Sequence, residues 1–289
     1  MKILVTGAQG QLGNALAHLA VQTDWEWIYT DKAELDITDK ATVDQYFAES
    51  DFTHCINCAA YTAVDQAEED RQMADLLNVT AVKHLAEAAA QYGTEFIHIS
   101  TDFVFSGKSF LPLKEEQEVD PVNHYGYSKW KGEQVALQGH AQAVVIRTSW
   151  LYGIEGNNFV KTMMRLGKER DSLGVIVDQI GTPTFANDLA QAIISIIPVL
   201  VKDHDKAGVY HYSNEGVASW YDFAHEIFEL ANLEVNLKPL ATHEYPTPAR
   251  RPHYSVMDKS KIKNTFGLII PHWRDSLKSC VSNLVYQLA

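Results

Sequence analysis

The chain has 289 residues, 46% of them hydrophobic, so it can bury a core of domain size and is not expected to be disordered. Its 24 basic and 37 acidic residues give a formal net charge of −13, which argues against nucleic acid as a partner. The longest apolar stretch, 192–201, falls short of the ~20 residues that a membrane-spanning helix needs. The residues after Met1 do not have the apolar segment of a secretory signal peptide, so we expect a cytoplasmic protein without a membrane partner.

A glycine-spaced turn follows the first expected strand, with Gly7, Gly10 and Gly13 in the pattern G-x-x-G-x-x-G. In such a turn the first glycine permits a tight bend, the second a close approach of phosphate, and the third close packing of helix on strand. The following helix offers unpaired N–H groups at its N-terminus. The turn therefore predicts a binding site for a dinucleotide's pyrophosphate.

Up to residue 150, strand-like and helix-like segments alternate. Strands are expected at 3–6, 25–30, 54–58, 95–100 and 143–148, and helices at 11–22, 41–49, 73–91 and 125–137. This alternation predicts an α/β fold: a Rossmann-type doubly wound parallel sheet that forms an NAD(P)-binding domain over 1–150.

The remaining residues, 151–289, are expected to form mainly a smaller, mixed, substrate-binding domain, with about 173–200 returning to the first domain. Helices are expected at 159–168, 187–197, 220–230 and 275–287, and strands near 175 and at 209–212. Four prolines in 238–253 predict an irregular segment, either an ordered loop over a cleft or a plain surface connection.

Cys55 and Cys58 have the C-x-x-C spacing of redox pairs, and Cys280 is the third cysteine. The pair lies inside a strand-like run and not at a helix start, where reactive thiols are found. Two buried, unreactive thiols are therefore the favoured interpretation.

Asp31 stands just past the second expected strand, where a carboxylate can accept hydrogen bonds from a ribose. Such a charge favours NAD over NADP, but the adjacent Lys32 can offset it, so the predicted preference for NAD is weak. An ordinary solvated Asp-Lys pair is the alternative.

The spacing Tyr-x-x-x-Lys occurs twice, as Tyr125/Lys129 and as Tyr127/Lys131. Residues four apart share a helix face, so a lysine can lower the pKa of the tyrosine and make it a general acid. The two pairs point to nearly opposite sides, so only one can face a cofactor. A hydroxyl at the preceding strand end, from Ser100 or Thr101, could polarise the same carbonyl; a simple turn is the alternative there.

These motifs occur in an order that resembles the extended short-chain dehydrogenase/reductases, and within them the dTDP-4-dehydrorhamnose reductases, over essentially the whole chain. The stretches that carry the resemblance are the glycine turn, Asn57-Cys-Ala-Ala-Tyr-Thr62, Asn78, Ser100-Thr-Asp102, Tyr125-Gly-Tyr-Ser-Lys129, Arg147-Thr-Ser-Trp-Leu-Tyr-Gly153, Gly156-Asn-Asn-Phe159, Asp178-Gln-Ile-Gly-Thr-Pro-Thr184 and Tyr245-Pro-Thr-Pro-Ala-Arg-Arg-Pro252.

The resemblance implies a role for individual residues. Thr101, Tyr125 and Lys129 would be catalytic, and Asn78 would support the backbone of the site. NADPH or NADH would contact Gly7, Gly10, Gln11, Leu12, Gly13, Asp31, Asp36, Ile37, Ala60, Tyr61, Thr62, Ile99, Tyr125 and Lys129. Thr101, Asp102, Trp150 and Arg251 would bind a dTDP-linked 4-keto-6-deoxysugar.

The implied reaction is reduction of dTDP-4-dehydro-β-L-rhamnose to dTDP-β-L-rhamnose, the last step of dTDP-L-rhamnose synthesis. Phe103 departs from the family's usual tyrosine and removes one hydroxyl near the sugar. Ala15 and Asn187 replace glutamates that bind a metal between subunits in some members, so no metal is expected and a homodimer is held only loosely. The alternatives are a reductase or epimerase of another 4-keto sugar nucleotide, and a non-catalytic regulatory subunit.

Overall fold

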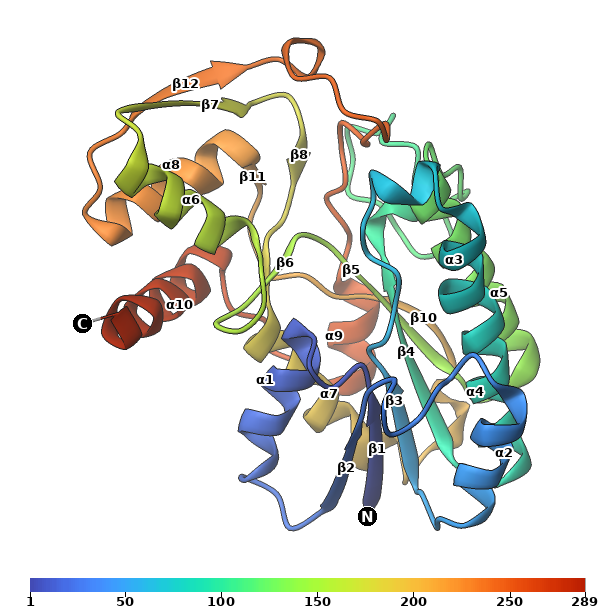
Figure 1. Ribbon diagram of the computed structural model, residues 1–289. Coiled ribbons are helices and arrows are strands. Elements are labelled where there is room, and N and C mark those ends of the chain that lie inside the picture. The colour runs from blue at the N-terminus through green and yellow to red at the C-terminus, as the bar shows by residue number, and fades with distance from the viewer. Residues whose placement is uncertain (289) are drawn as a thin grey trace.

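Six parallel strands form the central sheet of the computed structural model, which describes residues 1–288 (Figure 1). In the order β10-β5-β4-β3-β1-β2, the strands are β1 (Lys2–Thr6), β2 (Glu26–Thr30), β3 (His54–Asn57), β4 (Glu95–Thr101), β5 (Val144–Thr148) and β10 (Gly208–His211). Strand order reverses between β1 and β3. Parallel α/β sheets bind ligands beyond the carboxyl ends of their strands at such a switch point.

Helices cover both faces of this sheet (Figure 1). One face carries α2 (Lys40–Ala48), α4 (Ala81–Gln91) and α5 (His124–Gly139), and the other carries α1 (Gln11–Ala20), α7 (Ala186–Leu200) and α9 (Ser260–Phe266). Each face buries its own apolar core, with Phe47 and Leu85 in one and Leu16 and Ile193 in the other. The predicted doubly wound α/β fold is therefore confirmed.

The expected helix at 73–91 is interrupted. It consists of α3 (Arg71–Asp75), a π-helical turn η2 (Leu76–Thr80) and α4. A π-helical turn inserts one extra residue per turn and occurs most often at functional sites. Here it carries Asn78, whose side chain is fully buried. Short 3₁₀ turns complete this half at η1 (Gln66–Glu68) and η3 (Asp102–Val104).

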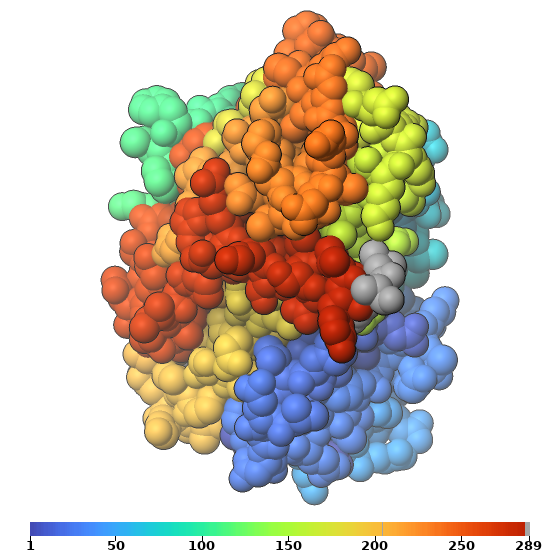
Figure 2. Space-filling view, turned by 90° about the vertical axis from the view of Figure 1, so that its left-hand side faces the viewer, coloured from blue at the N-terminus to red at the C-terminus, as the bar shows by residue number. Residues whose placement is uncertain are grey.

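A second core lies between α6 (Phe159–Glu169), α8 (Trp220–Ala231) and α10 (Trp273–Leu288). Three two-stranded sheets surround it: β6 (Leu151–Tyr152) with β9 (Thr184–Phe185), β8 (Ile180–Gly181) with β11 (Ala218–Ser219), and β7 (Ser172–Ile176) with β12 (Asn236–Leu240). Figure 2 shows α10, in red, between the orange α8–β12 region and the blue N-terminal region. The remaining 3₁₀ turns are η4 (His204–Lys206) and η5 (Thr242–Glu244).

Three segments of the second half bear on the predicted domain organisation. Helix α7, within the 173–200 segment expected to return, packs against α1. Strand β10 also joins the main sheet, although it lies outside that segment. The expectation that 238–253 is irregular is wrong at its start, where Lys238–Leu240 belongs to β12. Pro239 is tolerated because a two-stranded sheet has edges where a missing N–H breaks no ladder bond. No helix among residues 1–288 is long and apolar enough to cross a membrane.

Candidate active site

A cleft of about 900 Å³ opens at the carboxyl ends of the central strands. Of the residues predicted to bind cofactor or substrate, all line it except Gly13 and Tyr61. Residues from both halves contribute, because Trp150, Trp220 and Arg251 face the glycine turn and the end of β4 across the cleft. The fold thus brings together side chains that are up to about 240 positions apart in the sequence.

The glycine turn leaves room for an anionic group. Gly7 has φ 68°, and a Cβ there would lie 2.6 Å from the backbone nitrogen of Ala59. A Cβ on Gly13 would lie 2.4 Å from the carbonyl oxygen of Ala8, so Gly13 serves helix packing and does not line the cleft. Gly10 is the N-cap residue of α1, and no side chain there accepts a hydrogen bond from the first turn of the helix. The unpaired N–H groups of the first turn therefore suit a pyrophosphate.

The carboxylates of Asp31 and Asp36 line the cleft near the glycine turn. Asp31 accepts the backbone N–H of Gln9 at 2.8 Å through Oδ2, which fixes the carboxylate beside the turn. Asp36 accepts the N–H and hydroxyl of Thr38 at 3.0 and 2.6 Å, and these bonds lower its pKa. Lys32 lines the cleft beside them. The region therefore offers both an acceptor and a cation to the adenosine end of a dinucleotide.

Tyr125 and Lys129 are the pair that faces the cleft. The Tyr125 hydroxyl is a hydrogen-bonding partner of the Thr101 side chain. Lys129 is 2% exposed, and its Nζ donates to the carbonyl oxygen of Ile99 at 2.7 Å. The alternative pair lies on the outer surface. Tyr127 is 41% exposed there, and the Lys131 ammonium lies over its ring, 5.6 Å from the ring centre.

Burial dominates the proton affinities in this part of the cleft. It raises the pKa of Tyr125 to about 12 and lowers the pKa of Lys129 to about 8. The expectation of a lowered tyrosine pKa is therefore wrong for this structure, because desolvation of the phenolate, to which the charge of Asp102 adds, outweighs the Thr101 hydrogen bond. A phenol with a raised pKa stays protonated at neutral pH, as a proton donor must.

Asp102 follows Thr101 and is also buried. Desolvation raises its pKa to about 6, against smaller opposing effects of the Ser255 and Thr101 hydroxyls. Its Oδ1 accepts the Thr101 hydroxyl at 3.1 Å, whereas its buried Oδ2 makes no hydrogen bond of ordinary geometry among residues 1–288. A buried acceptor beside the cleft is suited to a hydroxyl of a bound molecule.

Ser100 is committed elsewhere. Its hydroxyl donates to Glu133 at 2.6 Å, and Glu133 also accepts two hydrogen bonds from Arg147, at 2.8 and 2.7 Å. All three side chains are buried. Of the two hydroxyls considered at this strand end, only that of Thr101 is therefore available to a substrate.

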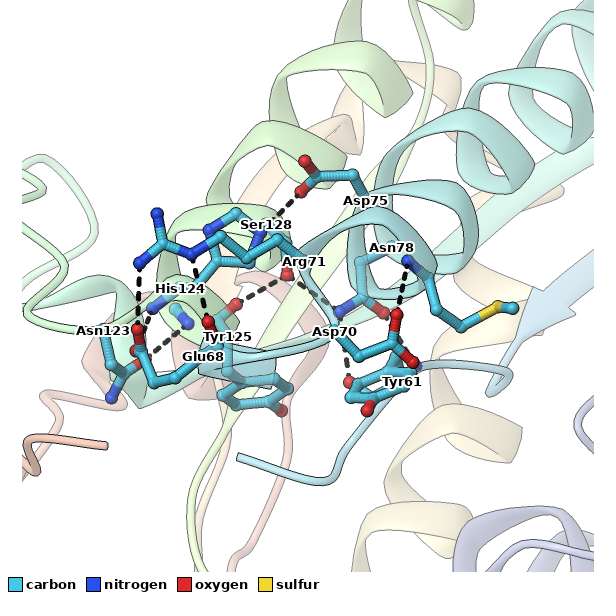
Figure 3. Close-up of polar contacts among 12 residues, drawn as sticks. Tyr61, Glu68, Asp70, Arg71, Asp75, Asn78, Asn123, His124, Tyr125 and Ser128 are labelled. Atoms are coloured by element: carbon cyan, nitrogen blue, oxygen red, sulfur yellow. Dashed lines mark hydrogen bonds and ion pairs between the residues drawn. The ribbon is translucent and has the colours of Figure 1, made fainter. Parts of the chain in front are cut away.

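Asn78 ties the π-helical turn to both sides of the site (Figure 3). It accepts the N–H of Tyr61 at 2.9 Å and donates to the Tyr61 carbonyl at 3.1 Å. It also donates to Ser128, which in turn donates to the carbonyl oxygen of Tyr125, at 2.9 and 2.8 Å. Tyr61 thus contributes through its backbone, and its side chain packs against the small cluster that contains Tyr125.

Two residues that position α5, Asn123 and Gly126, were not among the predicted site residues. Asn123 caps the helix by accepting the N–H of Gly126 at 2.8 Å, and its amide donates to the Arg250 carbonyl at 2.7 Å. Gly126 lets the helix approach η3, because a Cβ there would lie 2.1 Å from the carbonyl oxygen of Phe103. The sequence signal was present, since asparagine directly before a helix is among the preferred N-cap residues.

Trp150 is held in a stack and is not a free platform. Its ring lies 3.7 Å from that of Trp220, with an angle of 11° between the planes. Gly181 lies against the benzene part of the indole, since a Cβ there would be 2.8 Å from Trp150 Cε2. Trp150 also has φ 47°, which a residue other than glycine rarely adopts. One face of its ring is therefore already covered.

Arg251 is paired with a carboxylate across the cleft. Its two terminal nitrogens contact Asp65 at 3.0 and 2.8 Å, and Nη1 also donates to Thr247 and to the Ala249 carbonyl. The guanidinium therefore links the loop after β3 to the segment before α9. Its geometry suits phosphate oxygens as well as it suits carboxylate.

Cys55 and Cys58 do not form a pair. Cys55 packs in the core under α2 and α4, whereas Cys58 packs against the opposite core. Both thiols are free, and burial raises the pKa of each. The prediction of a buried thiol is confirmed for Cys55, whereas Cys58 is only partly buried and lines the cleft.

Comparison with known proteins identifies the family. The model described as RmlD substrate binding domain matches residues 1–286. A dTDP-4-dehydrorhamnose reductase from Aggregatibacter actinomycetemcomitans is 42% identical over 286 residues, which is 96% of this chain and 97% of that protein. The crystal structure of a dTDP-4-dehydrorhamnose reductase ortholog from Clostridium acetobutylicum gives a TM-score of 0.94 at 42% identity, covering 99% of this chain and 100% of that one.

A Bacillus anthracis dTDP-4-dehydrorhamnose reductase, solved in complex with NADP, has 40% identity and a TM-score of 0.93, with 98% and 99% of the two chains covered. Family model, sequence relatives and solved structures agree over nearly the full length. This chain therefore belongs to the dTDP-4-dehydrorhamnose reductase family.

Proposed function

We propose that the protein reduces dTDP-4-dehydro-β-L-rhamnose to dTDP-β-L-rhamnose with NADPH or NADH, the last step of dTDP-L-rhamnose biosynthesis. The observation that carries this proposal is the arrangement of Thr101, Tyr125 and Lys129 in the same cleft as the glycine turn. A non-catalytic subunit would have no need for a buried lysine and a protonated phenol beside a nucleotide site.

The cleft divides between cofactor and substrate. The pyrophosphate of the dinucleotide would lie on the first turn of α1, with Asp31 and Lys32 toward its adenosine ribose. The bound reduced nicotinamide would supply the hydride that the ketone carbon accepts. Lys129 would donate to the nicotinamide ribose, since Ile99 already fixes the position of its Nζ. Asp31 and Lys32 together are compatible with either NADH or NADPH.

The proton comes from the protein's own residues. Tyr125 would donate its phenolic proton to the oxygen that was the ketone, while Thr101 hydrogen-bonds the same oxygen. Both hydroxyls already interact with each other, so an oxygen placed between them would meet the Tyr125 donor and, once the Thr101 proton turns from Asp102 Oδ1, a second donor. The raised pKa of Tyr125 keeps the proton in place until negative charge develops on the substrate.

The sugar nucleotide would lie between the two halves. Asp102 would accept a sugar hydroxyl, and Trp150 would present its uncovered surface to the ring. Arg251 would bind the diphosphate, sharing its guanidinium with Asp65 or releasing it. In this scheme residues 1–150, with α7 and β10, bind the cofactor, and the rest of 151–289 binds the substrate.

We also propose a cytoplasmic location, where three free thiols stay reduced. A homodimer stays a prediction. Light scattering would test it by measuring the molar mass of the protein in solution. No metal is required for the proposed reaction, because the hydroxyls of Tyr125 and Thr101 would together stabilise the oxygen and Tyr125 would protonate it.

The test is a turnover assay with purified protein, NADH or NADPH, and 4-keto sugars linked to dTDP, GDP or UDP. Oxidation of the nicotinamide with the dTDP-linked ketosugar, and dTDP-β-L-rhamnose as product, is expected. Turnover of only a GDP- or UDP-linked sugar would move the assignment to a sibling enzyme. No oxidation with any pair would refute a reductase.

A further inference from the structure

His98 on β4 lies behind Lys129 and does not line the cleft. It is fully buried, with Nε2 3.5 Å from Lys129 Nζ and Nδ1 3.1 Å from Asn57 Nδ2. We propose that His98 is a positioning residue: Asn57 fixes its proton on Nε2, so Lys129 meets a donor there and turns its own N–H groups toward the cleft. The proposal rests on the role given to Lys129 above.

The orientation of the Asn57 amide follows from its other contacts. Its Oδ1 accepts the backbone N–H of Ala59 at 3.1 Å and the hydroxyl of Thr6 at 2.8 Å. A backbone N–H can only donate, so the atom facing Ala59 must be the oxygen. The amide nitrogen therefore faces His98, and Nδ1 of the ring must accept.

The ring of His98 is neutral. Its complete burial, with the charge of Lys129 as a second cause, holds the pKa of His98 well below its usual value. A neutral imidazole carries one proton, and the other ring nitrogen is an acceptor. Since Nδ1 accepts from Asn57, the proton is on Nε2, the atom that faces Lys129.

This tautomer limits what the lysine can do. An ammonium has three N–H donors, and the carbonyl of Ile99 takes one at 2.7 Å. An Nε2–H of His98 offers no acceptor for a second donor. The remaining donors are therefore left for the cleft, or the amine gives up a proton and accepts from His98.

Other charged and titratable groups also act on Lys129. Glu133 and Tyr125 lie on its own helix, and Cys58 lies beyond β3. Burial lowers the pKa of Lys129 to about 8, while Glu133 and Cys58 act in the opposite direction. The donor presented by His98 adds to the effect of burial, so the two together weaken the ammonium form.

The substitution Asn57→Asp tests this reasoning. An aspartate keeps an oxygen for Ala59 and Thr6 but replaces the amide donor by an acceptor. The proton of His98 then moves to Nδ1, and Nε2 becomes an acceptor for Lys129. The basic limb of the pH dependence of NADPH binding, followed by nicotinamide fluorescence, should shift upward by about one pH unit.

The same substitution in a His98→Phe protein is the matched control. Without an imidazole there is no proton to relocate, so the upward shift should shrink to what the distant charge alone produces. A purely structural role for His98 would change stability or affinity in the single variant without this coupling. Equal shifts in both backgrounds, or no shift in either, would overturn the proposal.

A second measurement needs no variant. In protein labelled with ¹⁵N-histidine, long-range ¹H–¹⁵N spectra distinguish the two neutral tautomers. We expect the His98 ring to carry its proton on Nε2, and a proton on Nδ1 overturns the proposal even if the variants do not fold. Because neither experiment uses the ketosugar, a protein that fails the turnover assay but shows the predicted shift refutes only the proposed function.

Discussion

Replacing Gly126 by alanine tests whether the chemistry depends on the close approach of α5 to η3. The new Cβ would lie 2.1 Å from the carbonyl oxygen of Phe103 and 2.9 Å from its carbon. These are backbone atoms, so the helix must retreat by about 1.3 Å to restore ordinary contact at 3.4 Å. Tyr125, the preceding residue, moves with the helix and away from Thr101.

A displacement of this size should lower kcat roughly 100-fold, or about 2.7 kcal/mol in activation free energy. The affinity for NADPH should fall less than kcat, because the glycine turn that would bind the pyrophosphate lies on a different helix and only the Lys129 contact to the ribose moves with α5. The assay is the initial rate of nicotinamide oxidation at saturating ketosugar, with thermal unfolding as a check on the fold.

Gly139→Ala on the same helix is the matched control. Its Cβ would lie 3.2 Å from Ala86 Cβ and 3.5 Å from Glu87 Cγ and from the Glu87 backbone nitrogen, so no backbone atom comes closer than ordinary contact. It should keep the wild-type kcat and gain up to about 1 kcal/mol of stability from helix propensity. A wild-type kcat in Gly126→Ala, or an equal loss in both variants, would refute the reasoning.

Three further predictions follow from the site. Tyr125→Phe should lower kcat by about 10²–10⁴ while NADPH still binds, as a fluorescence titration would report. Gly181→Ala should crowd Trp150 and raise the KM for the ketosugar about tenfold with an unchanged KM for NADPH. Asp102→Asn removes a carboxyl whose pKa in the folded protein, about 6, lies above its unfolded value. The wild type therefore loses stability as the pH rises through 6, and urea unfolding should show the variant gaining up to about 3 kcal/mol above that pH.

Much of the fold could be predicted because its signals are local. Each of the first five strands is a short apolar run, and each begins and ends within about two residues of its expected range. The π-helical turn at Asn78 could not be read in this way, since the sequence on either side has ordinary helical spacing. The turn is stabilised by hydrogen bonds to Tyr61 and Ser128, which are distant in the sequence.

The sequence by itself determined the doubly wound sheet, the glycine turn at Gly7 and the family, because short-range patterns and motif order carry that information. Tertiary structure alone decided which hydroxyl at the end of β4 is available, since Glu133 occupies Ser100. It also reversed the expected direction of the Tyr125 pKa and paired Arg251 with Asp65. Burial and partner choice depend on groups that meet only after folding, so no local pattern can encode them.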